Sequence, residues 1–370
     1  MNIREYFRGV KTTIEHNPYH CSTERILQIV ILGTICGLEN PKKIHRWASN
    51  EKIIRFLAEH FGVLTIPCYS QFTTILGIIE PKSLNDCFMK WVKSILPESL
   101  KDMVIAVDGK TIRSTSKMSR CTETVHMVSA HVASLGITIG QVSVEEKSNE
   151  IPAVRELVRL LDIEGCIVVA DALNCQKKTC QEIIDAGADY VLVAKENQKK
   201  LMESIEEHML DEEAQKEMDY AETLENNRGR LEHRRAFTST NIDAVENIES
   251  WPSLSSIGAI NRQVIRNNTA SNEWHFYISS RQLTAQELLK VARDEWSVES
   301  MHWLLDVHYS EDFCRVADAN TQKNMNIIRK IALNTLKDYK QVSNLKTPLS
   351  NLMLDCLVDH SLLMKIIDFA

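Results

Sequence analysis

The pattern of hydrophobic and polar positions divides the chain into a helical first part and a mixed second part. Up to about residue 97, apolar residues recur at helical spacing. Expected helices cover 26–38, a short segment opened by Pro41, 51–60 with a stop at Gly62, and a segment opened by Pro81. We therefore expect an all-helical N-terminal domain over residues 1–98.

From residue 103 the pattern changes to short apolar strands that alternate with helices. Strands are expected at 103–107, 125–133, 137–144, 166–170 and 190–194, and helices at 154–161 and 180–185. Such alternation indicates a mixed or parallel sheet that is covered on both faces. The sequence thus predicts an α/β domain over about residues 99–340.

A segment at about 200–282 interrupts this alternation and is predicted to be a β-rich insertion. It begins with an acidic helix, continues through a basic patch at 228–235, and contains expected strands at 258–266 and 274–278. Thr284 and Glu287 then form a capping-box signature for a helix that we expect to run through Leu304 or beyond. Further helices are expected at 320–338 and in a C-terminal tail over 341–370.

The net charge of −7 conceals an uneven distribution along the chain. Residues 202–227 hold ten acidic residues and one lysine, so the rest of the chain is slightly basic. An acidic average therefore does not exclude a basic face that binds nucleic acid. The ten cysteines form no CxxC pair, and the N-terminus has no signal-like apolar stretch, which favours a cytoplasmic protein with free thiols.

Three carboxylates are candidates for chemistry. Asp108 and Asp171 each follow an apolar run, so they would converge if the two strands are neighbours. Two close carboxylates repel each other, and a divalent cation relieves that repulsion. An Asp after a strand also commonly begins a turn, so neither residue alone establishes a site. Glu299 lies between Trp296 and Trp303 at helical spacing and is either a site residue or the edge of a core.

A series of short sequence motifs resembles those of one protein family, and the motifs occur in the same order along the chain. The motifs are Ala106–Arg113 (AVDGKTIR), Glu146–Ile151 (EKSNEI), Asp171-Ala172, Asp189–Leu192 (DYVL), Gly229-Arg230-x-Glu232, Tyr277–Ser280 (YISS), Trp296-x-Val298-Glu299, His302-Trp303-x-Leu305-Asp306-Val307 and Glu311-Asp312. Together they resemble bacterial insertion-sequence DDE transposases of the H-repeat-associated type. The resemblance covers about residues 15–340, and the helical N-terminal region resembles that family's associated domain.

The resemblance implies a ribonuclease-H-like mixed sheet with an inserted β subdomain and Asp108, Asp171 and Glu299 as the DDE triad. It implies metal-dependent DNA strand cleavage and strand transfer, with Mg²⁺ as cofactor and Mn²⁺ as a substitute. In this hypothesis Asp108 bridges two cations, Asp171 holds one, and Glu299 holds the other. The implied partners are DNA, as element ends and target, and further copies of the chain in a homodimer or larger synaptic complex. The implied location is the bacterial nucleoid.

DNA binding requires cations that contact phosphates. Candidates near the triad are Lys110, Arg113 and Lys195, with Asn197 and Gln198 as polar contacts. Candidates in the insertion are Arg228, Arg230, Arg234 and Arg235, and more distant ones are Arg315, Lys323, Arg329 and Lys330. Any one of these residues is equally compatible with a solvated surface charge.

Four departures from the family pattern leave alternatives open. Glu295 stands where the family usually has His, Ser300 where Asn is usual, and Asp306 where related transposases have a basic residue, although this subfamily commonly has Asp there. The tail at 347–370 also lacks the basic run that the resemblance implies. Glu295 adds a negative charge one turn from Glu299, which would weaken the approach of DNA. A catalytically impaired remnant that only binds DNA is therefore an alternative, and a metal-dependent nuclease that cuts without joining is another.

Overall fold

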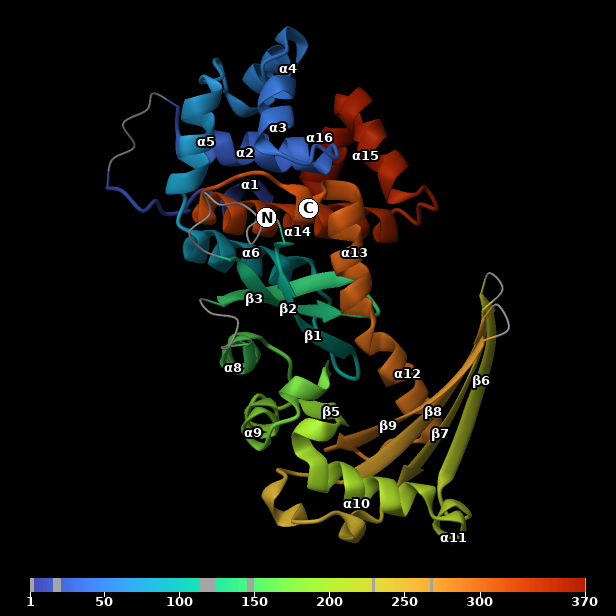
Figure 1. Ribbon diagram of the computed structural model, residues 1–370. Helices are drawn as coiled ribbons and strands as arrows, with labels where there is room; N and C mark the ends of the chain where they lie inside the picture. The colour runs from blue at the N-terminus through green and yellow to red at the C-terminus, as the bar shows by residue number, and fades with distance from the viewer. Residues whose placement is uncertain are drawn as a thin grey trace.

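The structure is a computed structural model that describes residues 3–15, 21–113, 124–144, 150–227, 230–266 and 269–369. Its described part is built around one nine-stranded sheet with strand order β3-β2-β1-β4-β5-β9-β8-β7-β6. Figure 1 shows helices gathered at one end of this sheet and long strands projecting at the other. The strands are β1 (Val104–Thr111), β2 (His126–Val132), β3 (Ile137–Val144), β4 (Ile167–Ala170), β5 (Asp189–Ala194), β6 (Asp219–Asn227), β7 (Arg230–Ser239), β8 (Ser256–Arg266) and β9 (Thr269–Ser279).

Helices precede the first strand, as predicted. They are α1 (Ile3–Tyr6), α2 (Thr23–Ile35), α3 (Pro41–Ala48), α4 (Glu51–Phe61), α5 (Tyr69–Ile78) and α6 (Pro81–Ile95). Pro41 and Pro81 each occupy a first helical turn, where the missing N–H costs nothing. Gly62 ends α4 in the left-handed conformation at φ +64°, which glycine adopts without a Cβ clash.

The last helices return to the N-terminal ones. α14 (Ala319–Val342) packs against α2, α5 and α6, and α15 (Leu349–Val358) and α16 (His360–Phe369) lie at the same end of the molecule (Figure 1). Of the 24 residues of α14, 15 are buried, so the helix is enclosed around most of its circumference. Several of them are polar; the side-chain amide of Asn324, for example, donates to the carbonyls of Leu76 and Ile79. No helix in the described ranges has the length and apolar character of a membrane span.

The first five strands form the mixed sheet that was predicted. β1 pairs antiparallel with β2 and parallel with β4, β2 pairs antiparallel with β3, and β4 pairs parallel with β5. α8 (Glu150–Leu160), α9 (Lys177–Asp185) and α12 (Ala285–Glu295) pack against these strands. This arrangement is a mixed α/β sheet with helices packed against it, and it confirms the predicted α/β class.

The inserted segment extends this sheet. It begins with α10 (Lys199–Leu210) and α11 (Glu212–Gln215), and continues through β6 to β9. β9 pairs antiparallel with β5, from Val191 opposite Ser279 to Ala194 opposite Phe276. The expected strands at 258–266 and 274–278 are present, whereas β6 and β7 were not predicted. The basic patch therefore lies largely on a strand.

Two expectations about element ends are wrong. Asp108 does not follow β1 but lies within it, because β1 continues to pair with β2 as far as Thr111. The long helix after Thr284 is two helices, α12 and α13 (Ser297–Tyr309). At the junction the Trp296 N–H donates to the Arg293 carbonyl, a tighter turn than the α-helical one, and this redirects the chain.

Candidate active site

Asp108 and Asp171 follow paired residues of two neighbouring strands. Val107 is opposite Ala170 in the parallel pairing of β1 and β4; Asp108 is the next residue within β1, and Asp171 is the residue directly after β4. The Asp108 side chain is 29% exposed. Asp171 begins the short 3-10 helix η2 (Ala172–Asn174), and its Oδ1 accepts hydrogen bonds from the backbone and side chain of Asn174. The two strands are thus neighbours, which is the condition under which Asp108 and Asp171 are expected to converge.

Glu299 lies in the first turn of α13, which packs against β1 and β2. It is exposed, with Trp296 and Trp303 exposed by 55% and 61% beside it. One turn further along α13, His302 Nδ1 lies 3.4 Å from Asp108 Oδ2, so the helix and the first strand meet at the candidate site. In the described ranges no three His, Cys, Asp or Glu side chains lie close enough to hold a metal ion.

The negative charges of these carboxylates nevertheless affect the pKa values of their neighbours Asp171 and Glu295. Partial burial raises the pKa of Asp171, hydrogen bonds from Asn174 oppose this shift, and the charges of Glu150 and Asp108 add to it. The pKa of Glu295, the last residue of α12, is raised to about 7, first by burial. Lys195 opposes that shift, and the charges of Asp171, Glu299 and Asp108 add to it. The donor set consists of hard carboxylate oxygens, which fit Mg²⁺ or Mn²⁺.

The raised pKa of Glu295 predicts a pH-dependent stability. An unfolded Glu titrates near pH 4.3. The native state keeps the proton up to about pH 7, so its stabilising contribution is complete below pH ~4.3 and is lost as the pH rises through 7. Glu295→Gln should match the wild type near pH ~4.5 and exceed its free energy of unfolding by roughly 2–3 kcal/mol near pH ~8. Urea unfolding at both pH values measures this difference.

The exposed Glu249 supplies the control for that measurement. Glu249→Gln should change the free energy of unfolding equally at both pH values. A Glu295→Gln effect that is also independent of pH would contradict the raised pKa.

Glu150 and His126 also belong to this region and were not predicted as site residues. His126 Nε2 lies 3.0 Å from Glu150 Oε2, and His126 Nδ1 lies 2.8 Å from Thr111 Oγ1. An added Cβ on Gly109 would lie 2.7 Å from both Glu150 Oε2 and His126 Nε2. The glycine after Asp108 is therefore explained by the close approach of this pair. The only signal in the sequence was the family resemblance at Glu150.

Asn197 and Gln198 hold the segment that follows Asp171. Asn197 Nδ2 donates to the Ala172 carbonyl at 2.6 Å, and Gln198 Nε2 donates to the Cys175 carbonyl at 3.1 Å. These contacts give both amides a structural role, while their contact with DNA stays a prediction. Lys195 is exposed at the end of β5 and is close enough to Glu295 to affect its pKa.

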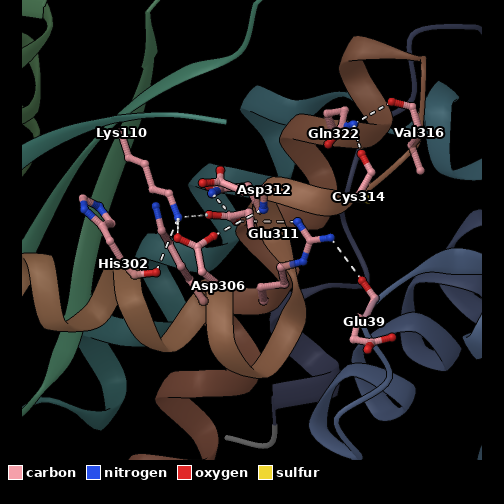
Figure 2. Close-up of polar contacts among 12 residues, drawn as sticks. Glu39, Lys110, His302, Asp306, Glu311, Asp312, Cys314, Val316 and Gln322 are labelled. Atoms are coloured by element: carbon pink, nitrogen blue, oxygen red, sulfur yellow. Dashed lines mark hydrogen bonds and ion pairs between the residues drawn. The ribbon is translucent and has the colours of Figure 1, made fainter. Parts of the chain in front are cut away.

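Lys110 lies in an internal ion network instead of offering a free cation to DNA. Its Nζ is 2.8 Å from Asp306 Oδ2 and 3.2 Å from Glu311 Oε2, and Figure 2 shows these groups facing one another. Burial alone would lower the pKa of Lys110, but Glu311 and Asp306 raise it, so the ammonium stays charged. Arg113 is 75% exposed and lies 3.6 Å from Asp312. Lys110 lies on β1 and Arg113 just after it, and of these two candidate DNA contacts Arg113 is the accessible one.

The predicted arginines of β7 surround one buried carboxylate. Arg230, Arg234 and the unpredicted Arg262 of β8 all form ion pairs with Glu232 at 2.6–3.0 Å. Burial would raise the pKa of Glu232, but the hydrogen bond from Arg262 and the three positive charges lower it. Glu225 also lies 4.0 Å from Arg234 and Glu273 lies 3.8 Å from Arg262, so the three arginines face three carboxylates. Arg262 also lies 5.7 Å from the Trp296 ring centroid, which places the cluster beside α13.

The remaining candidates have different environments. Arg235 donates to Asn261 Oδ1 at 2.8 Å, and Arg315 is exposed. Arg228 lies outside the described residues. Arg329 and Lys330 are 0% and 1% exposed in the middle of α14, so the expectation that they contact DNA is wrong. Burial lowers the pKa of Lys330 to about 7, and its Nζ donates to Ser129 and Gln141 instead.

Comparisons with known proteins agree with this arrangement. The family model described as Transposase DDE domain matches residues 99–335, and a second model, DDE_Tnp_1-associated, matches residues 10–92. The chain is 32% identical over 323 residues to two Escherichia coli K12 proteins, YbfL and the one named H repeat-associated putative transposase YhhI, with 85% of each chain covered. A solved piggyBac transposase synaptic complex with hairpin DNA has a TM-score of 0.49 and 8% identity, covering 98% of this chain and 76% of that one. On the family match and the two E. coli relatives, the chain belongs to the DDE transposase family.

Proposed function

We propose that the chain catalyses metal-dependent cleavage of DNA strands and their transfer to a new site, with Asp108, Asp171 and Glu299 as its catalytic carboxylates. The observation that carries this proposal is the pairing of β1 and β4, which makes Asp108 and Asp171 neighbours at one edge of the sheet. The contact between His302 and Asp108 brings the helix of Glu299 to the same edge.

The reaction is a pair of in-line displacements at phosphorus. Water attacks the phosphodiester first and the 3′-oxygen leaves, and the freed 3′-hydroxyl then attacks a target phosphodiester with departure of its own leaving oxygen. Asp108, Asp171 and Glu299 would hold divalent cations, which would supply charge stabilisation at the attacking and leaving oxygens. The chain contributes acceptor oxygens from β1, from the residue directly after β4, and from α13. His302 lies beside one Asp108 oxygen and so orients that carboxylate.

The surroundings of the carboxylates support DNA as the substrate. The exposed Lys195 and Arg113 fit contacts with phosphates. Trp296 and Trp303 expose aromatic faces next to Glu299, and unpaired bases stack on such faces.

The test uses the full chain and DNA that flanks its own gene. We expect nicking that yields a 3′-hydroxyl, requires Mg²⁺ or Mn²⁺, and stops with a chelator. Joining of the cut end to a second duplex separates a transposase from a nuclease that cuts without joining. DNA affinity should fall steeply as salt rises, because phosphate contacts release counterions. Tight, salt-sensitive binding without any nicking would instead identify a DNA-binding remnant, and salt-independent binding would contradict the proposed DNA surface.

A further inference from the structure

Lys110 occupies a special place relative to the proposed site. It follows Asp108 by two residues on β1, and alternate residues of a strand share one face of the sheet. Its side chain is 13% exposed and reaches away from the strand toward α13, as Figure 2 shows. A cation in this position is joined to Asp108 by a strand that is paired on both sides, with β2 and with β4.

The acceptors of Lys110 lie on and beside the helix that carries Glu299. Nζ is 2.8 Å from Asp306 Oδ2 and 3.4 Å from the His302 carbonyl, and both residues belong to α13. Glu311, just beyond α13, forms an ion pair with Nζ at 3.2 Å, although its Oε2 accepts no hydrogen bond in the part of the chain that the structure describes. Two hydrogen bonds and two ion pairs therefore hold the Lys110 ammonium against this region.

The acceptors are themselves fixed. Glu311 is 0% exposed, its Oε1 accepts a hydrogen bond from Asn326 at 2.9 Å, and Arg329 lies 3.5 Å from the same oxygen. Asp306 Oδ1 accepts from the backbone N–H of Asp312 at 3.3 Å. Lys110 therefore connects β1 to a buried polar network anchored on α14, and α13 is held between them.

We propose that Lys110 is a positioning residue that fastens α13 to β1 and thereby sets where the Glu299 carboxylate stands relative to Asp108. The inference rests on the proposed function, because it assigns Lys110 a part in that same site. It differs from a contact with DNA, since the ammonium is largely buried and is paired with Asp306 and Glu311 within the protein.

The experiment compares Lys110→Met, Asp306→Asn and the double variant with Lys93→Met. Lys93 is a matched control, because it pairs with Asp162 at 2.8 Å on the surface, where the two side chains are 72% and 71% exposed. Each protein is assayed for metal-dependent nicking, for DNA affinity as a function of salt, and for hydrogen exchange of the α13 amides, with α8 as internal reference.

Loss of positioning predicts a distinct combination of results. Nicking by Lys110→Met should fall about 10- to 100-fold, as expected for a misplaced catalytic group. DNA affinity should change by less than about twofold, and α13 amides should exchange roughly tenfold faster while α8 is unchanged. The double variant should be no slower than the slower single variant, because both changes break one connection.

Several outcomes would overturn the proposal. These are nicking by Lys110→Met equal to that of Lys93→Met, unchanged α13 exchange, or a weaker DNA affinity with a salt slope reduced by about one, which marks a phosphate contact. If Lys110→Met fails to fold, Asp306→Asn carries the same measurements, because Lys110 and Glu311 remain paired in it. If the wild type does not nick DNA, the proposed function fails, while the exchange of α13 still tests the connection.

Discussion

Asp108→Asn is expected to lower metal-dependent DNA nicking by at least about a thousandfold, which corresponds to about 4 kcal/mol. The change keeps the size of the side chain but removes a negative charge that a divalent cation requires as a ligand. Asp108 adjoins Asp171 across the β1–β4 pairing and His302 on α13. We therefore expect no neighbouring residue to take over its role as a cation ligand. The rate of strand nicking on a labelled duplex measures the effect.

DNA affinity separates this effect from a loss of binding. Asp108→Asn should bind flanking DNA as tightly as the wild type, because no cation that contacts phosphate has been removed. Asp162→Asn is the matched control, since Asp162 is exposed and pairs only with the surface residue Lys93 among the ion pairs described. Undiminished nicking by Asp108→Asn would remove Asp108 from the catalytic assignment.

Glu311→Gln should lower the free energy of unfolding by about 3–5 kcal/mol, the range for breaking a buried ion pair. Glu311 and Arg329 are both completely buried, and Lys110 also pairs with Glu311. Burial alone would raise the pKa of Glu311, but Arg329, Lys110 and Lys330 lower it, so the native carboxylate is charged. A neutral glutamine leaves Arg329 buried with only the Glu39 carbonyl, at 3.1 Å, as a described hydrogen-bond acceptor.

Glu213→Gln is the control, because it removes an exposed ion pair instead of a buried one. Glu213 is 82% exposed and pairs with Lys216 within a short helix, a type of pair worth less than about 1 kcal/mol. Urea unfolding of both variants at neutral pH compares them directly. A Glu311→Gln effect as small as that of Glu213→Gln would mean that the buried network contributes no net stability.

The parts of the fold that sequence alone predicted are those with a local cause. Pro41, Gly62 and the capping box at Thr284 mark helix ends through their own backbone and side-chain chemistry. The apolar runs before Asp108 and Asp171 are strands because both faces of the sheet are covered.

The failures have non-local causes. β1 extends past Asp108 because β2, a distant segment, supplies hydrogen-bonding partners up to Thr111. Arg329 and Lys330 resemble ordinary surface positions of an amphipathic helix. Their burial depends on partners distant in sequence: Glu311 and the Glu39 carbonyl for Arg329, and Ser129 and Gln141 for Lys330. Glu150 and His126 meet across Gly109 through tertiary packing that no spacing reveals. The triad assignment itself rests on the resemblance and stays a prediction.

The pairing of β5 with β9 has a consequence for any attempt to shorten the protein. The inserted strands satisfy the backbone N–H and C=O groups of Val191 to Ala194. Removing residues 200–282 would uncover an apolar strand with unpaired amides, and such an edge recruits strands from other molecules. A minimal catalytic core would therefore be prone to self-association unless that border were capped or charged.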